Sequence, residues 1–154
     1  MNPLQTIHAT GIVLGGAGVL VRGPSGAGKS LLALALLERW SLRGDDAMLV
    51  ADDSIALTQE GRQLIMHTPA SIAGRVELRG RGIIERPFRP HAPLHLVVDL
   101  VEETIRMPEP ASFRTNLGGA ALARCPVPRA GLIPLEHQIL LVDEAVRGLD
   151  LDLL

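Results

Sequence analysis

Several residue types are scarce in this chain of 154 residues, and each scarcity excludes a class of protein. Cys125 is the one cysteine, so a single chain can build neither a disulfide framework nor a cysteine metal site. Aromatic residues make up 2% and the net charge is -2, which argues against a nucleic-acid-binding surface. No apolar run reaches the length of a membrane span, and the N-terminus lacks a secretory leader pattern. We expect one cytoplasmic domain over residues 1–154 that binds neither membranes nor nucleic acid.

Lysine is nearly absent as well. Of the 15 lysines and arginines, only Lys29 is a lysine, and it lies in the segment GPSGAGKS. This segment fits the phosphate-binding pattern G-x-x-x-x-G-K-S, in which glycines let backbone N–H groups surround anionic oxygens, the ammonium reaches the β/γ-phosphates and a hydroxyl binds Mg²⁺. The bulkier guanidinium of arginine does not suit this position. We expect the following residues to bind the nucleotide: Gly23, Pro24, Ser25, Gly26, Ala27, Gly28, Lys29 and Ser30.

The pattern around this loop predicts an α/β order of elements. Residues 6–14 and 17–22 are predicted strands joined at Gly15-Gly16, and residues 29–42 are a helix rich in leucine and alanine. Apolar residues at intervals of four and three predict a terminal helix over residues 135–149. The remaining predicted elements are strands at 47–51, 55–58, 62–67 and 94–100, of which the second and third form a hairpin.

Three apolar runs end in acidic residues, and these are candidates for metal binding or proton transfer. The run before Asp143-Glu144 resembles that of a motor-type ATPase, but the spacing of its neighbours favours a helix face. Asp99 falls within a predicted strand, and we expect it to be solvated or on an edge. Asp52-Asp53 is the best candidate, because one carboxylate can orient Mg²⁺ or its water while the other accepts a proton from an attacking hydroxyl. The alternative is an ordinary turn before the next strand.

Residues 76–85, VELRGRGIIE, carry two glycines around an arginine. The glycine spacing predicts a mobile loop, from which Glu77 and Arg79 could reach metal and phosphate. An exposed charged loop without function is the alternative.

In the order of its motifs the chain resembles the HPr kinase/phosphorylases, which act on a serine of the phosphocarrier protein HPr. The resemblance rests on His8, GPSGAGKS, VADD and ELRGRGIIE, the last being close to the family signature E-I-R-G-x-G-I-I-D. It implies a P-loop kinase domain of the HPr kinase/phosphoenolpyruvate carboxykinase type, with a mixed central sheet and flanking helices. It also implies ATP and Mg²⁺ as cofactors, an HPr-like protein as partner and a homohexamer.

The resemblance assigns roles to individual residues. It makes Lys29 the γ-phosphate contact, and Ser30 and Glu77 ligands of Mg²⁺. It makes Asp53 the group that takes the proton from the substrate serine and returns it in the reverse reaction. His8 matches an active-site histidine. Arg106 matches an arginine that offsets charge on the transferring phosphoryl group, and Arg114 is a nearby competitor for that role.

The chain departs from the family pattern in three places. Fuller members carry an N-terminal domain without counterpart in these residues, so we expect a short form. Glu85 replaces an aspartate, and residues 136–138 replace a basic segment linked to dephosphorylation. The resemblance therefore predicts a serine kinase acting on HPr, with phosphorolysis of the product left open. The alternatives are a small-molecule or phosphoenolpyruvate carboxykinase-like enzyme, and a nucleotide-sensing module that transfers no phosphate.

Overall fold

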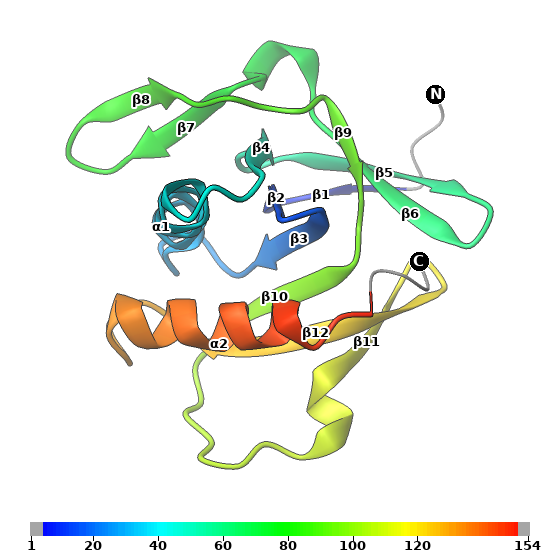
Figure 1. Ribbon diagram of the computed structural model, residues 1–154, viewed down its shortest axis with the longest axis vertical. Helices are drawn as coiled ribbons and strands as arrows, with labels where there is room; N and C mark the ends of the chain where they lie inside the picture. Colours follow the sequence, from blue (N-terminus) through cyan, green and yellow to red (C-terminus); the bar gives the residue numbers. More distant parts are fainter. Residues whose placement is uncertain (1–4, 151–154) are drawn as a thin grey trace.

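The computed structural model describes residues 5–150 and arranges them in three layers (Figure 1). The middle layer is a 6-stranded sheet with the strand order β11 (Arg114–Leu117), β12 (Ala120–Pro128), β10 (Leu96–Val101), β3 (Ala17–Arg22), β2 (Ala9–Leu14) and β4 (Ala47–Ala51). Helices α1 (Lys29–Leu42) and α2 (Leu135–Arg147) pack on one face. The other face carries a 4-stranded sheet of β1 (Gln5–Ile7), β5 (Ile55–Glu60), β6 (Gln63–His67) and β9 (His91–Pro93). Within this part of the chain, no helix is long and apolar enough to cross a membrane.

The inner strands of the central sheet are buried on both faces, which explains their continuous apolar sequences. Ile12 of β2 and Val98 of β10 pack toward the helices, whereas their neighbours Val13 and Val97 pack toward the second sheet. Strand β10 runs parallel to β3 and β12, while the other neighbouring pairs are antiparallel. The predicted α/β class with a mixed central sheet and flanking helices is confirmed.

The predicted elements next to the phosphate loop are confirmed, including the bounds of α1 and β4. The hairpin of β5 and β6 is confirmed too. The prediction of one strand over residues 6–14 was wrong, because the chain breaks at His8. The part before the break, β1, joins the second sheet, and the part after it, β2, joins the central sheet.

The segment predicted as a loop over residues 76–85 instead belongs to a β-hairpin. Strands β7 (Arg75–Leu78) and β8 (Gly82–Glu85) pair antiparallel, and a turn at Gly80 joins them. The hairpin lies beside α1 (Figure 1), where Val76, Leu78 and Ile84 pack against the core on the helix side of the central sheet. Alternating apolar residues therefore hold this segment in strand form, and its glycines mark the turn.

The sequence had predicted that Asp99 is solvated or on an edge of the sheet, and this prediction was wrong. The residue lies on β10 in the middle of the central sheet, and only 15% of its side chain is exposed. Its carboxylate accepts hydrogen bonds from Arg22 Nε at 2.7 Å and from Arg124 Nε at 2.6 Å. Burial alone would raise the pKa of Asp99, but these hydrogen bonds and the two positive charges hold that pKa below its usual range. The pairing depends on which strands flank β10, and the sequence alone does not show this.

Candidate active site

The phosphate loop connects the end of β3 to the first turn of α1. Gly26 and Gly28 have φ angles of 83° and 95°, in the left-handed region that favours glycine. Gly28 is also the N-cap of α1, so the free N–H groups of the first helical turn begin directly at the loop. Such a loop at a helix N-terminus is a ready-made binding site for anions. A further contact closes the loop from outside, because the Ala130 N–H donates to the Ala27 carbonyl at 3.2 Å.

Lys29 is a nearly buried cation, with 7% of the residue exposed. Its Nζ donates to the carbonyls of Gly23 at 2.7 Å and Pro24 at 3.1 Å. Among residues 5–150, no carboxylate lies within ion-pair distance of this ammonium. An ammonium has three protons, so one remains for another acceptor. A buried cation that borders a pocket without an acidic partner favours the binding of an anion there.

Asp52 follows β4 and collects three hydrogen bonds from three different elements. Its Oδ1 accepts from the hydroxyls of Ser30 at 2.7 Å and Thr10 at 2.8 Å. Its Oδ2 accepts from the backbone N–H of Glu77 at 3.2 Å. The sequence analysis had identified Asp52 only as one of the two adjacent aspartates. In the structure its carboxylate connects the phosphate-loop motif, β2 and the hairpin through hydrogen bonds.

Asp53 has an unusual backbone and an exposed carboxylate. Its φ angle is 100°, and it is the one residue other than glycine with a positive φ in the described chain. Its N–H donates to the Ala9 carbonyl at 2.9 Å, which holds this conformation. Asp53 Oδ1 lies 3.3 Å from His8 Nδ1, and both side chains are more than half exposed. His8 thus contacts Asp53, the residue that the family resemblance predicts to accept a proton; the active-site role of His8 remains a prediction.

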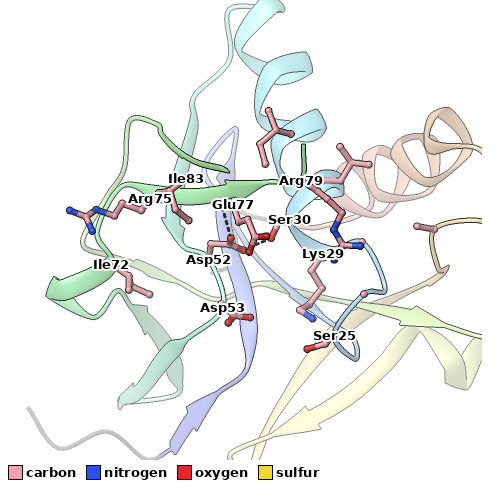
Figure 2. Close-up of a pocket in the computed structure, with 15 residues that line it drawn as sticks. Ser25, Lys29, Ser30, Asp52, Asp53, Ile72, Arg75, Glu77, Arg79 and Ile83 are labelled. Atoms are coloured by element: carbon pink, nitrogen blue, oxygen red, sulfur yellow. Dashed lines mark hydrogen bonds between the residues drawn. The ribbon is translucent and has the colours of Figure 1, made fainter. Parts of the chain in front are cut away.

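Lys29, Asp52 and Asp53 line one pocket of about 620 Å³ between the phosphate loop, the end of β4 and the hairpin. His8 does not line this pocket, although it contacts Asp53. Figure 2 shows the Lys29 ammonium and the Asp53 carboxylate on facing sides of the pocket, with Ser30 and Asp52 between the loop and the hairpin. Glu77 and Arg79 line it from the hairpin. The structure therefore brings together Lys29, Ser30, Asp53 and Glu77, the residues expected to bind phosphate and metal and to accept a proton.

Arg106 and Arg114 lie elsewhere. Both line a second pocket of about 1240 Å³, bounded by the segment after β10, strand β12 and helix α2. Neither of them lines the pocket at the phosphate loop. The catalytic role expected for Arg106 remains a prediction.

Residues 136–138 also lie away from the phosphate loop, in the first turns of α2. Glu136 pairs with Arg39, and the Gln138 side chain donates to the Pro128 carbonyl.

Two residues at or beside the site were missed in the sequence. Among the described residues after position 100, only Ala130 lines the phosphate-loop pocket. Neither Ala130 nor the buried Thr10 had been identified from the sequence. Thr10 carried one signal, as a polar residue in an otherwise apolar strand.

The donor set of the pocket suits magnesium. The described residues contain no cluster of three histidine, cysteine or carboxylate side chains arranged for a metal. Mg²⁺ does not require one, because it keeps several waters and binds one or two carboxylates together with substrate phosphates. The Ser30 hydroxyl, Asp52 and Glu77 all present hard oxygen atoms at this pocket, so the residues fit the ion.

Comparison with known proteins gives consistent matches. The family described as HPr Serine kinase C-terminal domain matches residues 1–106. A protein of Exiguobacterium sp. named HPr kinase/phosphorylase is 37% identical over 108 residues, which cover 65% of this chain and 33% of that protein. A protein of the same name from Listeria monocytogenes is 41% identical over 85 residues, covering 54% of this chain and 25% of that protein.

A solved structure is similar over nearly the whole chain. It is the Hpr(Ser) kinase/phosphatase from Coxiella burnetii, at 31% sequence identity and a TM-score of 0.76. The match covers 94% of this chain and 89% of that chain. The chain thus has the predicted P-loop kinase fold, while its alignment spans about a third of the length of the Exiguobacterium relative.

Proposed function

This chain belongs to the HPr serine kinase C-terminal domain family, and on that premise we propose that it transfers the γ-phosphoryl group of ATP to a serine of an HPr-like phosphocarrier protein. The observation that carries the proposal is the placement of Lys29 and Asp53 in one pocket. The nearly buried Lys29 ammonium at the phosphate loop would bind the phosphates of the nucleotide. The exposed Asp53 carboxylate, which faces it, would accept the proton of the incoming serine hydroxyl.

The phosphate-binding side of the reaction uses the loop and the start of α1. Backbone N–H groups of the loop and the third proton of the Lys29 ammonium would bind the β- and γ-phosphate oxygens. Ser30 and Glu77, together with Asp52, would hold Mg²⁺, which neutralises charge on the phosphates when bound. Ser30 lies on α1, Asp52 follows β4 and Glu77 lies on β7, so the tertiary fold assembles the metal-binding side of the site.

The acceptor side uses Asp53. Its carboxylate would accept the proton of the serine hydroxyl as the serine oxygen bonds to the γ-phosphorus and ADP leaves. His8, 3.3 Å from Asp53 Oδ1, would help to orient that carboxylate. The names of the relatives, HPr kinase/phosphorylase and kinase/phosphatase, support a second activity. In it, an oxygen of inorganic phosphate would attack the phosphorus of phosphoserine and lose its proton to Asp53. The bond between the phosphorus and the serine oxygen would break, Asp53 would return the proton to that oxygen, and pyrophosphate would leave.

Replacing Asp53 with asparagine should abolish transfer to HPr and leave ATP binding in place. Asparagine is suited to this test because it also tolerates the positive φ of position 53, so the backbone should not change. The assay is transfer of radiolabelled phosphate from ATP to HPr, with HPr carrying alanine at the acceptor serine as a negative control. Asp45→Asn, at an exposed site in the turn before β4, is the matched control and should retain activity.

Normal transfer by Asp53→Asn would show that Asp53 is not the proton acceptor. Failure of the unaltered protein to label HPr, with label passing to a small molecule instead, would favour a metabolite kinase. Tight ATP binding without any transfer would favour a nucleotide-sensing module.

Replacing Lys29 with alanine should remove the kinase reaction and the reverse phosphorolysis together, because both would use one phosphate site. The forward reaction is followed by labelled HPr, and the reverse reaction by pyrophosphate released from phosphorylated HPr and phosphate. Loss of one direction only would mean that the two reactions do not share this site.

The same family likeness supports proposals for the location and assembly of the protein. We place it in the cytoplasm, which suits the free thiol of Cys125. A homohexamer remains a prediction from the family resemblance.

A further inference from the structure

Thr10 is a fully buried polar residue on β2, a strand whose other residues are apolar or glycine. Its hydroxyl donates to Asp52 Oδ1 at 2.8 Å. Threonine is tolerated inside a core when its hydroxyl has a partner, and here that partner is a carboxylate of the candidate active site. The hydrogen bond connects an inner strand of the central sheet to the pocket.

The hydrogen bonds to Asp52 determine which of its oxygen atoms remains available. A carboxylate has about four acceptor sites, two on each oxygen. Oδ1 accepts from both the Thr10 and the Ser30 hydroxyls, and Oδ2 accepts from the Glu77 N–H. Both sites on Oδ1 are therefore occupied, and one site on Oδ2 remains.

The backbone just before Asp52 is irregular, so the orientation of the Asp52 side chain depends on its hydrogen bonds. The register between β2 and β4 shifts between Gly11 and Ile12, directly beside Thr10 and just before the end of β4. Irregularities of this kind re-aim the following side chains and are common next to active sites. A hydrogen bond from the rigid inner strand would define the rotamer of Asp52 after that irregularity.

We propose that Thr10 is a positioning residue for Asp52: its hydroxyl occupies the second acceptor site of Oδ1 and keeps Oδ2 as the oxygen open to the hydration shell of a divalent cation held at Ser30. This inference rests on the proposed function, since it concerns the metal that accompanies ATP. Through the Glu77 N–H, the same carboxylate also sets the position of the hairpin over the pocket.

The test compares Thr10→Val, which keeps the shape of the side chain and removes the hydroxyl, with Thr10→Ser, which keeps the hydroxyl. The affinity for ATP is measured by calorimetry with Mg²⁺ and again in EDTA. For Thr10→Val we expect Mg²⁺ to strengthen ATP binding about tenfold less than in the unaltered protein, since a hydrogen bond to a charged group is lost. We expect unchanged affinity in EDTA, a lower kcat for HPr phosphorylation, and recovery of both properties in Thr10→Ser.

Thr58→Val is the matched control. Thr58 is also buried, and its hydroxyl is hydrogen-bonded to His67 Nε2 at 2.8 Å in the second sheet, away from the pocket. This variant should lose stability without changing the effect of Mg²⁺. If Thr10→Val does not fold, Thr10→Ala carries the same comparison, because the smaller side chain cannot overpack the site.

Two results would overturn the inference. One is a Thr10→Val protein that loses stability but gains as much ATP affinity from Mg²⁺ as the unaltered protein. The other is an equal loss of affinity with Mg²⁺ and in EDTA, which would mean general damage to the loop. Failure of the proposed function is a separate outcome, seen as no transfer to HPr by the unaltered protein, and the binding comparison can still be read in that case.

Discussion

Alanine at position 28 should damage the phosphate loop more than alanine at position 26. Both glycines have a positive φ, so both substitutions place a side chain in the left-handed region. They differ in their surroundings. A Cβ on Gly28 would lie 2.9 Å from the Cβ of Ala130, whereas a Cβ on Gly26 would have no atom within 4 Å.

The expected cost of each substitution has two sources, the left-handed backbone conformation and the contact of the new Cβ with Ala130. The left-handed conformation costs alanine about 1–2 kcal/mol, and this term applies to both variants. Overpacking against Ala130 adds about 1–3 kcal/mol, and this term applies to Gly28→Ala alone. We expect Gly28→Ala to lose about 2–5 kcal/mol in total, divided between the free energy of unfolding and the free energy of ATP binding.

The assay is a double-mutant cycle with Ala130→Gly, which removes the methyl group that the new Cβ would meet. Unfolding in guanidinium can be followed by the fluorescence of Trp40, the one tryptophan, and ATP binding by calorimetry. The double variant Gly28→Ala/Ala130→Gly should recover to the level of Gly26→Ala, after correction for Ala130→Gly alone. Equal costs at positions 26 and 28, or no recovery in the double variant, would refute the contact between Ala130 and the loop.

Two further predictions concern titratable groups. His95 Nδ1 accepts a hydrogen bond from the Gly18 N–H at 2.9 Å, and burial lowers the pKa of His95 below its ordinary value of 6.5. The neutral ring therefore contributes stability above pH 6.5, and this contribution is lost as the pH falls below that value toward the lowered pKa. His95→Asn, which keeps an acceptor that does not titrate, should show a smaller fall in unfolding free energy between about pH 8 and pH 5; an unchanged pH dependence would contradict this. Burial raises the pKa of the Cys125 thiol to about 12, so this cysteine should not react with a thiol reagent at about pH 8 until the protein is unfolded. Rapid labelling of the native protein would be the contrary result.

Features set by local sequence could be predicted well. The bounds of α1 follow from a glycine-rich start and a run of strong helix formers, and β4 is a short apolar run between charged residues. The loop itself was identified because its chemistry is contained in eight consecutive residues. Lys29 and Ser30 could be singled out for the same reason, whereas Asp53 was chosen from the Asp52-Asp53 pair through the family resemblance.

Features that depend on strand order and register could not be predicted. The pairing of Asp99 with Arg22 and Arg124 requires β10 to lie between β3 and β12, and those strands are far apart in the sequence. The Thr10 hydroxyl reaches Asp52 only because β2 and β4 are neighbours with a shifted register. In the hairpin β7–β8, the glycines drew attention to mobility, while the alternation that marks a strand was too short to recognise.

The contact between Ala130 and Ala27 has a consequence for the order of events during synthesis. A nascent chain that has emerged from the ribosome as far as β10 already contains the whole phosphate-loop sequence. It does not yet contain β12, which pairs with β10, or the segment after β12 that closes the loop from outside. We expect the growing chain to become able to bind ATP only after residue 130 has left the exit tunnel, although its binding motif emerges well before that residue.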